Sequence, residues 1–303
     1  MLPHLVFSDE VAAARARGGP VVALESSIIV QGFPRPDNLA LGLALAEAVR
    51  AAGATPAILA VLDGRIHVGL NAADLERLAT TDVISKAAAR DLGPLIARGG
   101  SGATTVAASV AIAHAAGIQV FATGGIGGVH PDHGGPADIS ADLVALSRTP
   151  LVVVSAGAKS ILDLPATLEA LDSLGVPVVG YGTGVFPAFF TADSGLPAPS
   201  RLDGVAEVAR AFVAHCGLGL QSAMLIANPP PAATALGRAE VDALVAQAGE
   251  EARQSGIGGP ALTPYLLAAL DRLSGGRTRA ANRALALANA DLAGRIAMAL
   301  QPG

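Results

Sequence analysis

Short, almost wholly apolar runs recur along the sequence, and segments with helical spacing separate them. The clearest runs are residues 20–30, 55–62 and 150–155. A strand that is covered by helices on both faces has this continuous apolar pattern, which is typical of a parallel sheet. We therefore expect an α/β fold, with three layers (α/β/α) around a largely parallel sheet. The pair Asp63-Gly64 predicts a hairpin after the second run, which makes the sheet mixed.

The composition limits the core and the partners of this chain. Aromatic residues make up 3% of the 303 residues, so Ala, Val, Leu and Ile must build most of the core. No repeat, linker or change of composition divides the sequence, and we expect a single domain over residues 1–303. The net charge of −5, without any run of Lys or Arg, argues against a nucleic-acid surface.

We expect a cytoplasmic protein that is not anchored in a membrane. The longest soft apolar run, residues 106–126, is interrupted by His114, Gln119 and several glycines, which argues against a membrane span. The N-terminal residues lack the apolar core of a signal peptide. The single cysteine, Cys216, cannot form an internal disulfide, as is usual in a reducing compartment.

Lysine is rare in this chain. Of the 20 basic residues, 18 are Arg and only Lys86 and Lys159 are Lys. A buried lysine can become a neutral amine, whereas arginine keeps its charge. Both lysines are therefore candidates for chemistry that arginine cannot perform. Two alternatives stay open: the two lysines remain by chance, and Lys86 is an ordinary solvated cation. Lys159 follows an apolar run, and ligands of open α/β sheets bind beyond the carboxyl ends of strands.

Glu25 interrupts the first apolar run. A carboxylate in apolar surroundings is costly unless it is paired or protonated. Two interpretations stay open at this point: a catalytic acid that holds its proton, or a strand-end glutamate paired with an arginine.

Three polar stretches are candidate ligand sites. Residues 98–105 are rich in Gly, Ser and Thr and are expected to open a helix, where free N–H groups bind anions; a plain helix cap is the alternative. Residues 124–135 contain His130, Asp132 and His133, which offer a zinc site, although such a loop more often binds no metal. Asp138 and Asp142 share one face if their segment is helical, and their oxygens suit Mg²⁺ or Mn²⁺; the alternative is a helix cap plus a solvated Asp.

Taken together, these stretches resemble the indigoidine synthase A-like family, the pseudouridine-5′-phosphate glycosidases. FATGGIGGVH, DISADL and AGAKSILD together are far more specific than any short motif. The matches occur in order over nearly the whole chain: ALESSII (23–29), GFPRPDN (32–38), RDLG (90–93), GATTVAASV (102–110), FATGGIGGVH (121–130), DISADL (138–143), SAGAKSILD (155–163), GVPVVGY (175–181), FPAF (186–189), ANPPP (227–231) and the TP-to-ANxAL segment (263–285).

The resemblance implies a reaction, a cofactor and an assembly. The family reversibly cleaves the C–C glycosidic bond of pseudouridine 5′-phosphate to give uracil and ribose 5-phosphate. It requires a divalent metal, typically Mn²⁺, and is usually a homotrimer with a three-layer core.

The resemblance also implies roles for individual residues. The nucleophile falls on Lys159, the proton donor on Glu25, the second, substrate-holding lysine on Lys86, and the metal-linked aspartate on Asp138. Further substrate contacts fall on Val106, His130, Ser140, Ala141, Asp142 and Asn282.

These residue types suit that chemistry. A C-glycoside has no heteroatom leaving group, so protonation of a glycosidic oxygen is not available. An imine at C1′ of the ring-opened ribose provides an electron sink, and only a neutral amine can form it. An acid must then protonate the uracil carbon.

Five positions depart from common family members. Gln31, Phe33 and Arg35 stand where a His-Gly-Met-Pro-Tyr-Pro stretch usually has His, Met and Tyr, Ala88 replaces a Ser, and Pro131 replaces a frequent Arg. These changes bear on loop contacts and on the exact substrate. Two alternatives to the glycosidase also remain: an aldolase-like enzyme that forms a Schiff base with a sugar phosphate through Lys159, and a non-catalytic sugar-phosphate-binding protein.

Overall fold

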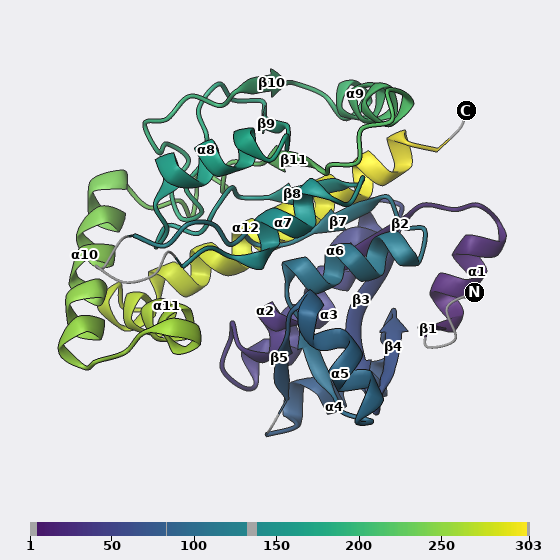
Figure 1. The fold of residues 1–303 in the computed structure, drawn as a ribbon, viewed down its shortest axis with the longest axis horizontal. Helices are drawn as coiled ribbons and strands as arrows, with labels where there is room; N and C mark the ends of the chain where they lie inside the picture. The colour runs from purple at the N-terminus through teal and green to yellow at the C-terminus, as the bar shows by residue number, and fades with distance from the viewer. Residues whose placement is uncertain (1–4, 83, 132–137, 302–303) are drawn as a thin grey trace.

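A mixed sheet forms the centre of the computed structural model, which describes residues 5–82, 84–131 and 138–301 (Figure 1). Five neighbouring strands at its centre run parallel, in the order β2 (Val21–Leu24), β7 (Val120–Ala122), β8 (Val152–Ser155), β11 (Met224–Ala227) and β9 (Val178–Tyr181). The short strand β10 (Ser200–Leu202) pairs in parallel with β9. The buried strands contain mainly Val, Ala, Leu and Ile, as a sheet covered on both faces requires.

The antiparallel part of the sheet lies on the other side of β2. Strand β3 (Thr55–Leu62) pairs in parallel with β2, and the Asp63-Gly64 turn then leads into the antiparallel strand β4 (Arg65–Val68). Both turn residues have positive φ angles, 50° and 72°, as a tight hairpin needs. Three further short strands complete this part: β1 (Leu5–Phe7), β5 (Ser85–Ala87) and β6 (Gly102–Thr104).

Helices cover both faces of the sheet (Figure 1). The layer on one face consists of α6 (Val106–Ala115), α7 (Ala141–Ser147) and α8 (Leu164–Ser173). The layer on the other face consists of α3 (Asp37–Ala51), α9 (Val205–Gly217) and α12 (Arg277–Ala299). The remaining helices are α1 (Asp9–Ala16), α2 (Ser27–Val30), α4 (Ala72–Thr80), α5 (Leu92–Ala97), α10 (Arg238–Gln254) and α11 (Leu262–Leu273). The expected three-layer α/β/α fold is confirmed.

Small side chains allow the helices to pack closely. Helix α12 crosses α3 at Gly294, where an added Cβ would lie 2.5 Å from the Cβ of Ala52. An alanine at position 294 would therefore force the two helices apart. This packing brings α12 over β2, β7 and β8, the strands whose ends carry the candidate site. None of the described helices is long and apolar enough to cross a bilayer.

Local predictions were accurate where the apolar spacing was unbroken. The strand at 55–62 and the hairpin after it are both confirmed. The run 20–30 was wrong as one strand, because β2 ends at Leu24 and Ser27–Val30 turns into the short helix α2. The helix expected to open at 98–105 is confirmed, because Thr105 caps α6, which begins at Val106; the strand β6 at Gly102–Thr104 just before it was not predicted.

Candidate active site

The site lies where the order of the sheet reverses direction. The chain passes from β2 outward to β3 on one side, and from β7 outward to β8 on the other. Such a switch point leaves a crevice beyond the carboxyl ends of the two central strands. Leu24 and Ala122 are paired at those ends, and the next residues along the chain are Glu25 and Thr123.

Two hydroxyl groups hold the Glu25 carboxylate. Glu25 is only 7% exposed, and its Oε1 and Oε2 accept hydrogen bonds from the hydroxyls of Thr123 and Ser27 respectively. No described arginine or lysine forms an ion pair with it, so the pairing with an arginine that remained open from the sequence is absent among the described residues. Hydroxyl donors orient a carboxyl group without adding a positive charge.

The backbone around Lys159 is fixed by the segment that follows β7. The Lys159 N–H donates to Ile126 O at 3.2 Å, and the Ile126 N–H donates to Gly157 O at 3.1 Å. Gly157 has a φ of 79°, and an added Cβ would lie 2.2 Å from the carbonyl oxygen of Pro187, so no side chain fits there. This turn places the half-buried Lys159 side chain at the crevice.

Lys86 reaches the same crevice from strand β5. Its side chain is partly open to solvent, yet the protein atoms around it remove enough hydration to lower its pKa from the usual 10.5, and the positive charge of Lys159 lowers that pKa further. The negative charges of Glu25 and Asp142 raise the pKa of Lys86 and offset part of this shift. The two rare lysines therefore lie close enough to influence one another.

One pocket contains four of the sequence-predicted site residues: Glu25, Lys86, Lys159 and Asn282. Asn282 comes from α12 and is 8% exposed, and its Oδ1 accepts no hydrogen bond from any described residue. The other walls are mainly apolar and are formed by Ile28, Gly124, Gly125, Phe189, Pro264 and Leu267. A pocket with apolar walls and a few convergent polar groups is typical of a small-molecule site.

The predicted residues of the DISADL stretch lie outside that lining. Asp142 is buried, and its two carboxylate oxygens accept the N–H groups of Ala107 and Gly127, both at 2.9 Å. It therefore joins the N-terminus of α6 to the glycine loop after β7. Ser140 caps α7 and accepts the Asp142 N–H at 3.2 Å, whereas Ala141 is exposed.

Asp138 and Asp142 do not share a helix face, because the condition for it, a helix that includes both, is not met. Helix α7 begins only at Ala141; Asp138 precedes it and is exposed, whereas Asp142 is buried. The Asp138 carbonyl accepts the N–H of His130 at 2.9 Å, which places both residues at one loop. Val106, also predicted to line the site, is buried in the first turn of α6.

The described residues offer a metal ion few protein ligands. They contain no group of three His, Cys, Asp or Glu side chains placed to hold one. Asp132 and His133, two candidates for a zinc site, lie outside the described residues. The exposed carboxylate of Asp138 fits a hydrated Mg²⁺ or Mn²⁺, because these ions often take one or two carboxylates and complete their shell with water or substrate oxygens.

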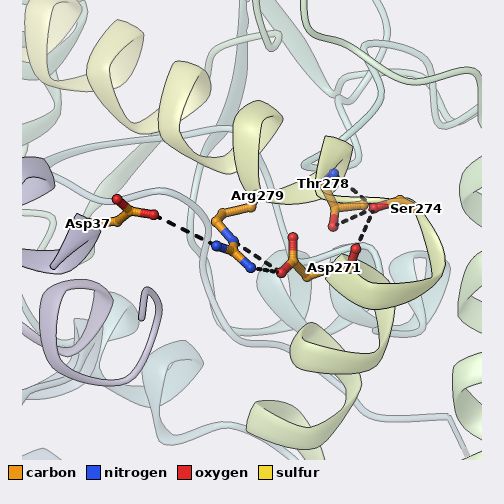
Figure 2. Close-up of polar contacts among 5 residues, drawn as sticks. All are labelled: Asp37, Asp271, Ser274, Thr278 and Arg279. Carbon is orange, nitrogen blue, oxygen red and sulfur yellow. Dashed lines mark hydrogen bonds and ion pairs between the residues drawn. The ribbon is translucent and has the colours of Figure 1, made fainter. Parts of the chain in front are cut away.

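A charged cluster fixes the helix that closes one side of the pocket (Figure 2). The Arg279 guanidinium on α12 donates two hydrogen bonds to Oδ2 of Asp271 on α11, one of them at 3.0 Å, and its Nη1 lies 3.7 Å from Asp37 on α3. Asp271 raises the pKa of Arg279 through the hydrogen bond. Ser274 completes the link between α11 and α12, since it accepts the Thr278 N–H at 3.1 Å.

Comparison with known proteins places this arrangement in a family. The family model described as "Indigoidine synthase A like protein" matches residues 10–299. The chain belongs to the indigoidine synthase A-like family. A pseudouridine-5′-phosphate glycosidase of Jannaschia sp. (strain CCS1) is 52% identical over 98% of both chains. One of Gemmatimonas aurantiaca is 53% identical over 98% of this chain and 96% of its own.

Two solved structures have the same fold. The prealnumycin C-glycosynthase AlnA, solved in complex with ribulose 5-phosphate, is 44% identical, with a TM-score of 0.90 over 98% of this chain and 97% of its own. An indigoidine synthase A-like protein of Thermotoga maritima is 34% identical, with a TM-score of 0.88 over 97% of this chain and 95% of its own.

Sequence reasoning missed three residues that support the site in this member of the family. Ser27 and Thr123 bind the Glu25 carboxylate. Asn289 is fully buried on α12 and donates to the carbonyl oxygens of Thr123, at 2.8 Å, and Gly124, at 3.2 Å. One signal was present: Asn289 follows Asn282 by seven residues, so a helix places both on the same face.

Proposed function

We propose that the chain reversibly cleaves the C–C glycosidic bond of pseudouridine 5′-phosphate, giving uracil and ribose 5-phosphate through an imine on Lys159. The observation that carries this proposal is that both lysines of the chain and the buried Glu25 line one pocket. Relatives about 50% identical over their full length bear the name of this enzyme, which supports the choice of substrate.

The first step uses Lys159 as the nucleophile. Its neutral amine attacks C1′, the C1′–O4′ bond breaks, and the amine proton passes to O4′, which opens the ribose ring. Lys86 lines the same pocket, and its positive charge attracts the anionic half of the substrate.

The second step separates the base from the sugar. Glu25 delivers a proton to C5 of the uracil ring, the C1′–C5 bond breaks, and the nitrogen lone pair of Lys159 forms the C=N bond of the imine. Water then adds to C1′ of the imine, a proton of that water passes to the nitrogen, and the C1′–N bond breaks, which releases open-chain ribose 5-phosphate and the free lysine. Thr123 and Ser27 hold the Glu25 carboxyl group in place for the proton transfer.

The walls of the pocket suit the uracil ring. Phe189, Pro264 and Leu267 supply apolar surface for a planar base. The buried Oδ1 of Asn282 has no donor among the described residues, so a uracil N–H group can donate to it without displacing an existing bond. By family resemblance we assign further substrate contacts to Val106, His130, Ser140, Ala141 and Asp142.

A divalent metal ion, Mn²⁺ by family resemblance, is part of the proposal. Asp138 would hold it, with water or substrate oxygens as the other ligands. Bound there, the ion would supply positive charge for the oxygens of the substrate. We also propose, from the resemblance and the sequence, that the protein is a cytoplasmic homotrimer.

One pair of experiments tests the function against its alternatives. The purified chain is incubated with pseudouridine 5′-phosphate and Mn²⁺, and uracil release is followed by absorbance, with Lys159→Arg as the matched control. Separately, the chain is reduced with borohydride in the presence of ribose 5-phosphate, and its mass is measured.

The outcomes separate the candidates. An adduct on Lys159 together with uracil release supports the glycosidase. An adduct without uracil release favours an aldolase-like enzyme, and the absence of both favours a binding protein.

A further inference from the structure

Lys86 is attached to the sheet indirectly. Among the described strands, its strand β5 pairs only with β6, and β6 joins the body of the sheet through two residue pairs with β3, at Ala103 and Gly102. The place of Lys86 in the pocket therefore depends on how firmly β6 is held. Thr104 ends β6 and is paired with Ala87, the residue after Lys86.

Ser26 holds that end of β6. Its hydroxyl donates to the carbonyl of Leu59 at 2.6 Å and accepts the backbone N–H of Thr104 at 2.9 Å. The Thr104 hydroxyl donates to the same Leu59 carbonyl at 2.8 Å. Ser26, Leu59 and Thr104 are all fully buried, so no water can replace a bond that is lost.

Ser26 also follows Glu25 directly in the chain. Glu25 faces the pocket, and Ser26 is turned into the sheet toward β3 and β6. One hydrogen-bonded network therefore joins the backbone beside Glu25 to the strand that adjoins the Lys86 strand. The two hydroxyl oxygens, Ser26 Oγ and Thr104 Oγ1, also lie 3.3 Å apart, so the two residues contact each other directly as well as through Leu59.

We propose that Ser26 and Thr104 are positioning residues that fix Lys86 relative to Glu25 and Lys159. Neither touches the substrate in this proposal, which rests on the proposed function for its catalytic consequence. The geometric part does not depend on the reaction, because it concerns only where Lys86 lies.

A matched control exists in the same network. Ser109 is also fully buried, and its hydroxyl donates to the Thr104 hydroxyl at 2.9 Å. It lies on α6, at the end of the network that does not reach Ser26 or the backbone beside Glu25. Ser109→Ala therefore removes a buried hydrogen bond of the same kind while the link from Ser26 to β6 stays in place.

The first test measures Lys86 without any substrate. The chain has only two lysines, so pulse acetylation at a series of pH values, read by peptide mass spectrometry, gives a separate labelling midpoint for Lys86. In Ser26→Ala and Thr104→Val, we expect this midpoint to move up toward that of an ordinary lysine, because a displaced β5 regains hydration. Ser109→Ala and the conservative Thr104→Ser should keep the wild-type midpoint.

The second test uses the reaction. In Ser26→Ala and Thr104→Val, we expect KM for pseudouridine 5′-phosphate to rise about tenfold, equivalent to ~1.4 kcal/mol, with a smaller change in kcat. Thr104→Ser should restore the wild-type KM. Circular dichroism checks that each variant is folded. Ser26→Ala alters the contact between Ser26 and Thr104 from the side of Glu25, and Thr104→Val alters it from the side of β6.

The two tests fail in distinguishable ways. If Ser26→Ala and Thr104→Val keep the wild-type labelling midpoint and lose only as much stability as Ser109→Ala, the positioning role is overturned. If the midpoints shift as expected but the wild type releases no uracil, the proposed function fails while the positioning of Lys86 stands.

Discussion

Lys86 and Lys159 face the same pocket, although one lies on a strand at the side of the sheet and the other follows a central strand. The pKa of Lys86 is lowered first by the loss of hydration to surrounding protein atoms and then by the charge of Lys159. In the proposed reaction the two lysines have different roles: Lys86 binds the anionic substrate as a cation, and Lys159 attacks as a neutral amine.

The affinity for ribose 5-phosphate should fall at a lower pH than it would if Lys86 had the pKa of an ordinary lysine. Because the pKa of Lys86 is lowered, its cation is present below that pKa and is lost as the pH rises through it. In Lys86→Arg the charge persists, so the alkaline loss of affinity should disappear. Lys86→Met should lower affinity at neutral pH by about 10- to 100-fold, the loss of one charge-assisted hydrogen bond. Titration calorimetry across pH measures both, and an identical alkaline limb in Lys86→Arg would exclude Lys86 as its source.

Lys159→Arg should abolish turnover and leave the fold intact. The substitution keeps the charge and approximate size but removes the nucleophile, so kcat should fall by several orders of magnitude. Borohydride should then trap no ribose 5-phosphate adduct, while the circular dichroism spectrum matches the wild type. Substantial residual activity would contradict the imine mechanism.

Thr123→Val should slow base release without preventing imine formation. The variant keeps the shape of the side chain but removes one of the two hydroxyl donors to Glu25. General acid catalysis contributes about 10²- to 10⁴-fold, so we expect kcat to fall by about 10-fold for Thr123→Val and by about 10²- to 10⁴-fold for Glu25→Gln. Both variants should still form the borohydride-trapped adduct. A wild-type kcat in Thr123→Val would show that the hydroxyl does not position the acid.

Asp138→Ala should remove the response to Mn²⁺ together with most of the activity. The prediction follows from the single exposed carboxylate that the described loop offers to an ion. Activity is measured against Mn²⁺ concentration, and Asn71→Ala, which removes the helix cap of α4 away from this loop, serves as the control for general damage. An unchanged Mn²⁺ response in Asp138→Ala would show that the metal binds at another position.

Arg279→Met should destabilise the protein by about 1 kcal/mol of unfolding free energy, because it leaves the carboxylate of Asp271 without its cation (Figure 2). Asp37→Ala should change stability far less, since its carboxylate is largely exposed and lies 3.7 Å from Arg279. Chemical denaturation gives both values. Equal losses in the two variants would mean that the interaction with Asp271 is not the stronger one.

The sequence predicted the layers of the fold well because buried strands and amphipathic helices have distinct periods. The sequence-based prediction failed where one largely apolar run contains the end of a strand and the start of a helix. Residues 20–30 are apolar up to Leu24 and again from Ile28, so hydrophobicity alone does not distinguish a continuing strand from the short helix α2 that begins at Ser27. The same limit hid the strand at Gly102–Thr104, whose glycine and hydroxyl residues suit a helix N-terminus equally well.

The candidate site was predicted in part. Residue chemistry alone singled out Lys86, Lys159 and Glu25, and the structure brings them into one pocket. Their partners could not be found this way, because Ser27 and Thr123 are common residue types whose importance arises only from contact with Glu25. The roles assigned to Asp138 and the DISADL contacts stay predictions.

Helix α12 has a consequence for the biosynthesis of this protein. It follows every strand of the sheet in the chain, yet it packs on β2, β7 and β8 and supplies both Asn282 and Asn289. A nascent chain on the ribosome can therefore complete all its strands and still lack one wall of the pocket and the cover of its central apolar face. We expect the catalytic activity to appear only after α12 has emerged. Until then the unfinished chain should expose the apolar face of the sheet, the kind of surface that chaperones bind.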